Sequence, residues 1–240
     1  GHETNSTSQM FESFANVVEE YYDKGDSSPE DRDVRRRLLY AICYHLTRVG
    51  DMVYMKDEHL MSGCVLTAIM NSFVTMMHFR IAYLVLGRGR PGGASLSDFR
   101  KYVCLKVYGD DNIASVAASA AWFNPEQIAT VMNSFGIVMT MADKVSAVTQ
   151  NFDDVCDLQF LKCTTRRSLG EIPGVEYFPR VEEASVIKSL MATHSNIDTF
   201  SIVYALGNDC LSRVWSSGAQ RFVLWRRRIA AVWRRIGLME

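Results

Sequence analysis

Residues 103–116 read VCLKVYGDDNIASV, and this stretch decides the fold of the middle of the chain. In its first half apolar residues occupy every second position, which is the period of a β-strand. Polar residues interrupt the pattern over 109–112, and apolar residues resume at Ile113. The sequence therefore predicts a β-hairpin whose tip carries two neighbouring acids, Asp110 and Asp111.

The adjacent carboxylates at this tip suit a divalent cation, because like charges this close repel each other unless a cation lies between them. Magnesium prefers hard oxygen ligands and is typically held by one or two carboxylates plus substrate phosphates. Asp110 and Asp111 are therefore candidate metal ligands in a phosphoryl-transfer site. A solvated turn is the alternative, since Gly-Asp-Asp-Asn is also ordinary turn composition.

An apolar run over residues 66–86 predicts a buried helix that ends at Gly87. Ser62-Gly63 precedes this helix, and Thr67 and Asn71 lie four residues apart near its start, so both project from one face. A hydroxyl and an amide placed together can bind a sugar hydroxyl. Taken singly, the two residues are equally well explained as a hydroxyl bonded back to its own helix and a satisfied polar core residue.

The rest of the chain predicts helices at both ends of a mixed middle, which makes the fold class α+β. Helices are predicted over 8–23, over 29–49 with an end at Gly50, over 124–136, and from Pro179 to the C-terminus with breaks at Gly207 and Gly218. Strands are predicted over 52–55, 137–140 and 158–163.

Composition excludes several classes of protein. With 240 residues, 48% hydrophobic and 22% charged, the chain is long and apolar enough to bury a core, so disorder, collagen and coiled coil are ruled out as a whole. A net charge of −1 gives no overall sign of polyanion binding. The six cysteines are scattered and form no CxxC pair, which favours a reduced cytosolic setting and argues against a structural zinc site. We also expect no signal peptide. The apolar stretch at 64–86 is long enough to span a bilayer, but the polar residues within it favour a core helix.

Four segments, in order, resemble motifs B, C, D and E of viral RNA-dependent RNA polymerases, with the picornavirus-like group as the nearest match. The segments are Ser62-Gly63-x3-Thr67-x3-Asn71-Ser72, Tyr108-Gly109-Asp110-Asp111-Asn112, Ala142-Asp143-Lys144 and Phe160-Leu161-Lys162. The likeness covers about residues 50–180. It implies a truncated right-hand polymerase: a palm of antiparallel sheet and packed helices with part of the fingers over 1–180, and a mainly helical thumb over 181–240.

This resemblance implies RNA-templated RNA synthesis in viral genome replication, by nucleotidyl transfer from nucleoside triphosphates to an RNA 3′-end. In that case Asp110 and Asp111 bind the catalytic magnesium or manganese ions. Lys144 matches the motif D lysine that protonates the pyrophosphate leaving group, where a cation also offsets developing negative charge. Read singly, Lys144 is a solvated loop lysine.

The resemblance also implies binding roles. Ser62 and Gly63 belong to a mobile loop beside the templating base pair, and Thr67 and Asn71 help to recognise the ribose 2′-hydroxyl of the incoming nucleotide. Lys162 matches the primer grip, where a cation lies near the RNA backbone. The implied partners are template and primer RNA, nucleoside triphosphates, a missing N-terminal polymerase portion, viral replication proteins and a membrane surface. The implied location is the host cytoplasm, in membrane-associated replication complexes.

Two motifs depart from the family pattern. Met61 stands where the family usually has proline before the Ser-Gly of motif B, and Cys163 stands where motif E usually continues with arginine. Motif A, with its aspartates spaced D-x4-D, is not found, and two aspartate pairs are decoys. Asp26 and Asp31 have that spacing but flank the start of a helix, and Asp51 and Asp57 bracket a strand-like segment directly before motif B, too late in the order. Family spacing places motif A before Gly1. Because two-metal catalysis needs that third carboxylate, we expect residues 1–240 alone to be inactive.

The C-terminal segment interleaves arginines with large apolar residues, which predicts an amphipathic helix with a basic side. The arginines are Arg221, Arg226, Arg227, Arg228, Arg234 and Arg235. RNA backbone contact, attachment to an anionic membrane and a plain solvated face all remain open.

Two other functions compete with RNA synthesis on an RNA template. A reverse transcriptase shares the palm and an acidic hairpin. A non-catalytic interaction module would use the hairpin to bind a cation structurally and the basic helix to dock RNA, a partner or a membrane.

Overall fold

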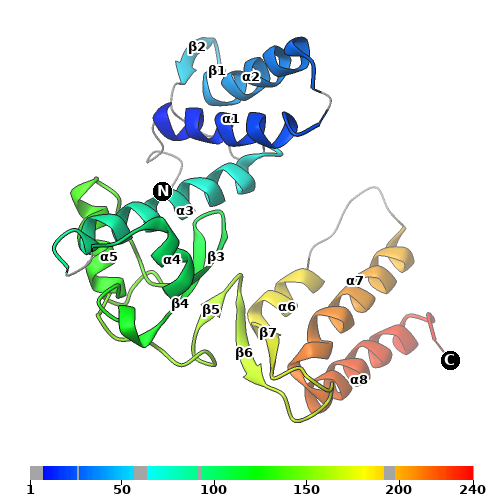
Figure 1. Ribbon diagram of the computed structural model, residues 1–240. Coiled ribbons are helices and arrows are strands. Elements are labelled where there is room, and N and C mark those ends of the chain that lie inside the picture. Colours follow the sequence, from blue (N-terminus) through cyan, green and yellow to red (C-terminus); the bar gives the residue numbers. More distant parts are fainter. Residues whose placement is uncertain (1–7, 26, 57–63, 91–92, 192–197, 240) are drawn as a thin grey trace. The chain divides into compact units, whose positions relative to one another are not determined.

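The computed structural model describes residues 8–25, 27–56, 64–90, 93–191 and 198–239 (Figure 1). The chain forms two compact units, Gly1–Phe152 and Asp153–Glu240. This division falls before the predicted domain boundary at residue 180, because the sheet whose last strand ends at Val181 packs with the C-terminal helices. The small antiparallel sheets and numerous helices agree with the predicted α+β class.

The first unit begins with two helices, α1 (Ser8–Tyr22) and α2 (Pro29–Cys43). A capping box starts α2: the Ser28 hydroxyl accepts a hydrogen bond from the Asp31 N–H, and the Asp31 carboxylate accepts one from the Ser28 N–H. The prediction that this helix continues to residue 49 is wrong. Strand β1 (His45–Val49) pairs antiparallel with β2 (Met52–Lys56), so Gly50, at φ +61°, is part of a tight hairpin turn and does not end a helix.

Helix α3 (Thr67–Gly87) is the central element of this unit, as its apolar sequence predicts. Near its start it contacts α1, where Met70 joins a core cluster with Phe11 and Phe14. Farther along it contacts α4 (Leu96–Tyr102), β3 (Val103–Tyr108) and α5 (Pro125–Ser134). Among the described helices, α3 is the one with the length and hydropathy of a membrane span, a property it shares with core helices of soluble proteins.

Strands β3 and β4 (Asp111–Val116) form the predicted hairpin, with Val103 opposite Val116 and Tyr108 opposite Asp111. The unit's larger core lies beside this hairpin, where Phe123 is fully buried among the rings of Tyr83 and Phe99. Helix α4, an element that was not predicted, is capped by Ser95, whose hydroxyl accepts a hydrogen bond from the Asp98 N–H.

The strand predicted over 137–140 is wrong, because this segment has no ladder partner. Ile137 and Met139 pack against the larger core, while Val138 between them is exposed. The alternation of buried and exposed residues therefore comes from an irregular segment after α5 that packs against the core on one side. A period of two indicates a strand only where a neighbouring strand can pair with it.

In the second unit, β5 (Gln159–Phe160), β6 (Cys163–Arg167) and β7 (Tyr177–Val181) form an antiparallel sheet in that order. The strand predicted over 158–163 is thus a hairpin, with its turn at Leu161 and Lys162, both at positive φ. The helices are α6 (Glu183–Leu190), α7 (Thr199–Val214) and α8 (Ala219–Arg235), so helical structure begins after β7 and not at Pro179.

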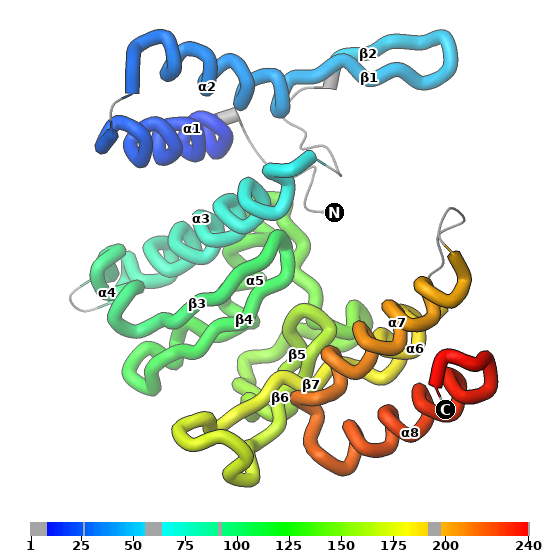
Figure 2. Tube along the Cα trace, turned by 90° about the vertical axis from the view of Figure 1, so that its right-hand side faces the viewer, coloured from blue at the N-terminus to red at the C-terminus, as the bar shows by residue number. Residues whose placement is uncertain are grey.

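Helices α7 and α8 lie side by side (Figure 2). The predicted helix break at Gly207 is wrong, since α7 continues through this residue. A Cβ atom at Gly207 would lie 2.5 Å from Cζ2 of Trp233, so the glycine allows α8 to approach closely. The predicted break at Gly218, at φ +103°, is confirmed. Arg166 ties the sheet to these helices: its Nε donates to the Ser216 carbonyl at 2.7 Å and its guanidinium lies over the Phe178 ring.

Candidate catalytic hairpin

The acidic tip is a two-residue turn between β3 and β4. Tyr108 pairs with Asp111, which leaves Gly109 and Asp110 as the central residues of the turn. Gly109 has a φ of +67°, while Asp110 is not among the residues with positive φ. A type II′ hairpin turn requires a positive φ at its first central position, and glycine adopts it without steric cost.

Two side chains of α3 hold this turn. Gly109 is buried, and its N–H donates to the Ser72 hydroxyl at 2.7 Å. Its carbonyl accepts a hydrogen bond from the Thr75 hydroxyl at 2.8 Å. The Ser72 hydroxyl in turn donates to the Ala68 carbonyl, so its proton and a lone pair are both used. Both backbone polar groups of Gly109 are therefore satisfied by α3, and the position of the tip is set by that helix.

Neither Ser72 nor Thr75 was predicted to have a role in the site. Both lie on α3, within four residues of Asn71. Ser72 and Thr75 are three residues apart, so they project from the same side of the helix. The signal in the sequence was that Asn71, Ser72 and Thr75 are small polar residues in a mostly apolar helix. Their partner, the glycine of the turn, is more than thirty residues farther along the chain, which periodicity cannot reveal.

The predicted metal ligands are placed side by side by this turn. Asp110 is exposed, and its carbonyl accepts a hydrogen bond from the Asn112 side chain at 3.1 Å. Asp111 is half-buried at the first position of β4. Within the ranges that the structure describes, no three His, Cys, Asp or Glu residues group closely enough to hold a metal ion. The hard oxygen donors of two adjacent carboxylates nevertheless fit magnesium, which completes its coordination with waters and substrate phosphates.

Asn71 lies one residue before the Ser72 anchor and is buried, with 9% of its surface exposed. Its Oδ1 atom has no hydrogen-bond partner among the described residues. A buried polar atom without a partner costs free energy, so this oxygen favours a ligand that carries a donor. Thr67 is half-buried at the start of α3. Ser62 and Gly63, the other two residues predicted in this group, lie outside the described residues.

Lys144 lies in the irregular segment after α5, with an exposed side chain and a φ of +60°. The preceding Asp143 accepts hydrogen bonds from the Ser146 hydroxyl and from the backbone N–H groups of Val145 and Ser146. These bonds, led by that of the Ser146 side chain, lower the pKa of Asp143. The carboxylate of Asp143 thus orders the turn that carries Lys144, and no described contact joins Lys144 to the hairpin.

The remaining predicted residues lie elsewhere. Lys162 belongs to the second unit, in the turn between β5 and β6. Of the decoy aspartates, Asp31 caps α2 and Asp51 is exposed in the β1–β2 turn, whereas Asp26 and Asp57 lie outside the described residues. Neither decoy pair forms a site among the described residues.

Helix α8 is amphipathic, as predicted. Trp225 and Ile229 are buried in the core of the second unit, while most of the arginines are exposed. Two of the arginines, Arg221 and Arg228, form ion pairs with Glu183.

We expect Thr75→Val to lower the free energy of unfolding by roughly 1–3 kcal/mol, because it leaves the buried carbonyl of Gly109 without a donor. Urea denaturation of the wild type and the variant measures the difference. Thr130→Val is the matched control, since the Thr130 hydroxyl is exposed and bonds only within its own helix. Equal effects of the two variants would show that the contact between Thr75 and the turn is not formed.

The chain is similar to several known viral proteins. The family model of viral RNA-dependent RNA polymerases matches residues 5–193. The chain is 32% identical over 157 residues to the RNA1 polyprotein of Grapevine chrome mosaic virus, covering 65% of the chain and 7% of the polyprotein. It is 31% identical over 183 residues to the RNA1 polyprotein of Tomato black ring virus (76% of the chain, 8% of the polyprotein). With the RNA1 polyprotein of Grapevine fanleaf virus it shares 28% identity over 191 residues (79% and 8%). The chain thus spans less than a tenth of these polyproteins.

Proposed function

The chain belongs to the viral RNA-dependent RNA polymerase family, and from this membership we propose that it is part of a polymerase that copies an RNA template into RNA in viral genome replication. Polymerases of this family are nucleotidyltransferases that use RNA, nucleoside triphosphates and divalent metal ions. The observation that carries the proposal is the anchored turn: Ser72 and Thr75 of α3 fix Gly109, so that Asp110 and Asp111 stand at a set position next to this helix. Positioned charge of this kind is what phosphoryl transfer requires.

Asp110 and Asp111 are the residues that would hold magnesium or manganese. The bound ions would neutralise the triphosphate and activate the attacking 3′-hydroxyl. The protein's own contribution is rigidity, because a turn that is hydrogen-bonded at both polar groups of Gly109 does not have to be ordered during the reaction.

In this proposal the start of α3 binds the nucleotide. The unpartnered Oδ1 of Asn71 accepts a hydrogen bond from the ribose 2′-hydroxyl, with Thr67 beside it, and Ser62 and Gly63 contribute the loop next to the templating base pair. Lys144 donates a proton to the pyrophosphate, and Lys162 contacts the primer backbone. The side chain of Lys144 is exposed, so a substrate can reach it from solvent.

The larger assembly is also part of the proposal. Residues 1–180 serve as palm with part of the fingers, and residues 181–240 as thumb. A preceding polymerase portion supplies the third carboxylate, so residues 1–240 alone are inactive. Further partners are viral replication proteins and a membrane surface, in replication complexes of the host cytoplasm.

Sugar selection tests this function against a reverse transcriptase. We expect the natural polymerase that contains this chain to incorporate ribonucleotides over deoxynucleotides by at least about a hundredfold, because a site built to bind a hydroxyl rejects an analogue without it. Asn71→Leu is expected to reduce that preference at least about tenfold. Single-nucleotide primer extension measures both, with Asn133→Leu, on the exposed face of α5, as the control. A preference for deoxynucleotides would support a reverse transcriptase.

The non-catalytic module remains a second candidate because most arginines of α8 are exposed. Sedimentation with anionic liposomes, without any affinity for RNA, would favour it.

A further inference from the structure

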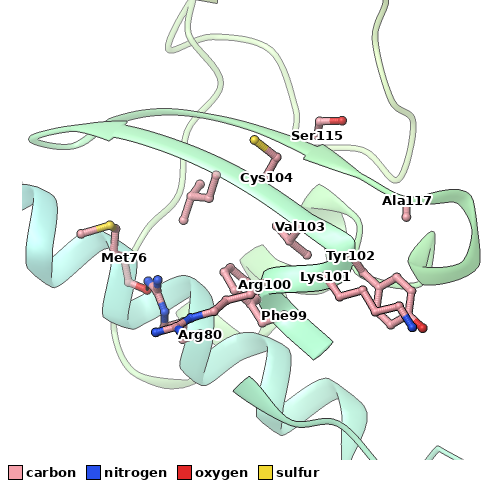
Figure 3. Close-up of a pocket in the computed structure, with 11 residues that line it drawn as sticks. Met76, Arg80, Phe99, Arg100, Lys101, Tyr102, Val103, Cys104, Ser115 and Ala117 are labelled. Atoms are coloured by element: carbon pink, nitrogen blue, oxygen red, sulfur yellow. Dashed lines mark hydrogen bonds between the residues drawn. The ribbon is translucent and has the colours of Figure 1, made fainter. Parts of the chain in front are cut away.

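A cavity of about 470 Å³ lies at the base of the β3–β4 hairpin, at the end of β3 opposite the acidic turn. Its walls come from α3, from the last turn of α4, and from the paired ends of the two strands (Figure 3). The volume is in the range of sites that bind small molecules, and it exceeds the space that one phosphate group fills.

The charged side chains that line this cavity are all cationic. They are Arg80 of α3 and Arg100 and Lys101 of α4, and no carboxylate is among the lining residues. Figure 3 shows the guanidinium groups of Arg80 and Arg100 at the same side of the cavity, near Met76. Among the described residues, neither arginine forms an ion pair with an acid. Burial lowers the pKa of Arg80, and the charge of Arg100 lowers it further.

Arg80 is held in place by the protein while much of its hydrogen-bonding capacity stays unused. One Nη donates to the Met76 carbonyl at 2.9 Å, and the guanidinium lies 5.2 Å from the centre of the Phe99 ring. A guanidinium has five N–H donors in a planar fork that matches carboxylate and phosphate geometry. The remaining donors of Arg80 have no protein partner within the described ranges.

A purely structural role explains the positions of Arg100 and Lys101 but not that of Arg80. Arg100 and Lys101 lie in the last turn of α4, where cations complement the helix dipole. Lys101 also lies over the ring of Tyr102, at 5.0 Å. Arg80 comes from α3, so its place in this cavity is not explained by the preference for cations within the last turn of α4. Bringing its half-buried charge beside Arg100 without an acid costs free energy, which an anion in the cavity would offset.

We propose that this cavity binds an organic phosphate, with the phosphoryl group between Arg80 and Arg100 and the apolar part of the ligand against Met76, Val103 and Leu105. Paired guanidinium groups bind phosphate oxygens through short charge-assisted hydrogen bonds. The site is separate from Asp110 and Asp111, which lie at the other end of the hairpin. The inference does not depend on the polymerase function.

Phenyl phosphate is the soluble probe, since it combines a phosphoryl group with an apolar ring. Binding to the 240-residue chain is measured by isothermal titration calorimetry with EDTA present, which removes metal-mediated binding at the acidic turn. We expect Arg100→Glu to weaken binding at least about tenfold, because the substitution replaces an attraction by a repulsion. Arg80→Gln is expected to weaken it similarly, and Arg88→Glu, an exposed arginine after α3, should leave it unchanged.

A second experimental arm distinguishes a free organic phosphate from a lipid headgroup. Phosphatidylcholine vesicles that contain phosphatidylinositol 4-phosphate are sedimented with the same proteins. Retention of the wild type but not of Arg100→Glu assigns the cavity to a headgroup, and phenyl phosphate binding alone assigns it to a soluble ligand. Circular dichroism checks that the Arg100→Glu variant is folded, which we expect because Arg100 is exposed. Absence of binding to both probes, or binding that Arg100→Glu and Arg88→Glu alter equally, would overturn the proposal.

Discussion

Replacing Asp110 or Asp111 by asparagine is expected to lower nucleotide incorporation by the natural polymerase at least about a hundredfold. Asparagine keeps the size of the side chain but removes the negative charge and the anionic oxygens that a divalent cation prefers. The turn itself should survive, because it is held through the backbone of Gly109 and not through the carboxylates. Single-turnover primer extension across a range of magnesium concentrations measures the effect.

Asp51→Asn is the control for this prediction. Asp51 is fully exposed in the β1–β2 turn, so its replacement should leave incorporation unchanged. The same control tests whether Asp51, one of the decoys for the motif A aspartates, takes part in catalysis. If Asp110→Asn and Asp111→Asn retain wild-type rates and an unaltered magnesium dependence, the acidic tip is an ordinary solvated turn.

Phe123→Ala is expected to lower the free energy of unfolding by about 3–5 kcal/mol. Phe123 is fully buried, and its ring packs edge to face against Phe79, Tyr83 and Phe99. Truncation removes these contacts and leaves a cavity that rigid aromatic neighbours cannot fill. Urea denaturation followed by circular dichroism gives the change in stability.

Phe135→Ala serves as the control for the core substitution, because Phe135 is more than half exposed. Its effect should stay within about 0.5 kcal/mol. Phe123→Leu keeps most of the buried volume and provides a milder variant if Phe123→Ala does not fold. A loss below about 1 kcal/mol for Phe123→Ala would mean that this aromatic cluster is not the core of the first unit.

The elements that the sequence predicted correctly are those whose signal is local. The hairpin over 103–116 shows strand periodicity on both sides of a glycine turn, and α3 is a long apolar run that ends at a glycine. The errors concern residues whose role depends on distant partners. Gly50 belongs to a hairpin because β1 finds β2, and Gly207 stays inside a helix because Trp233 packs against it.

In the candidate site too, features with a local signal were predicted and features that depend on distant partners were missed. Asp110 and Asp111 were predicted from their own short motif, and the structure places them on a turn as expected. The groups that fix this turn, Ser72 and Thr75, were missed because their hydrogen bonds join a helix to a turn far along the chain. The pairing of Arg80 with Arg100 was missed for the same reason. Periodicity predicts which face a residue occupies, but not what the fold brings against that face.

RNA-templated synthesis is tested most directly by the choice of nucleotide. The natural protein that contains residues 1–240 is given a primer on two RNA templates that differ only in the next templating base. We predict that it adds the complementary ribonucleotide on each template with magnesium, that chelation abolishes the addition, and that residues 1–240 alone add none. Addition of the same nucleotide on both templates, or no addition by a folded protein on several templates, would contradict the proposed function.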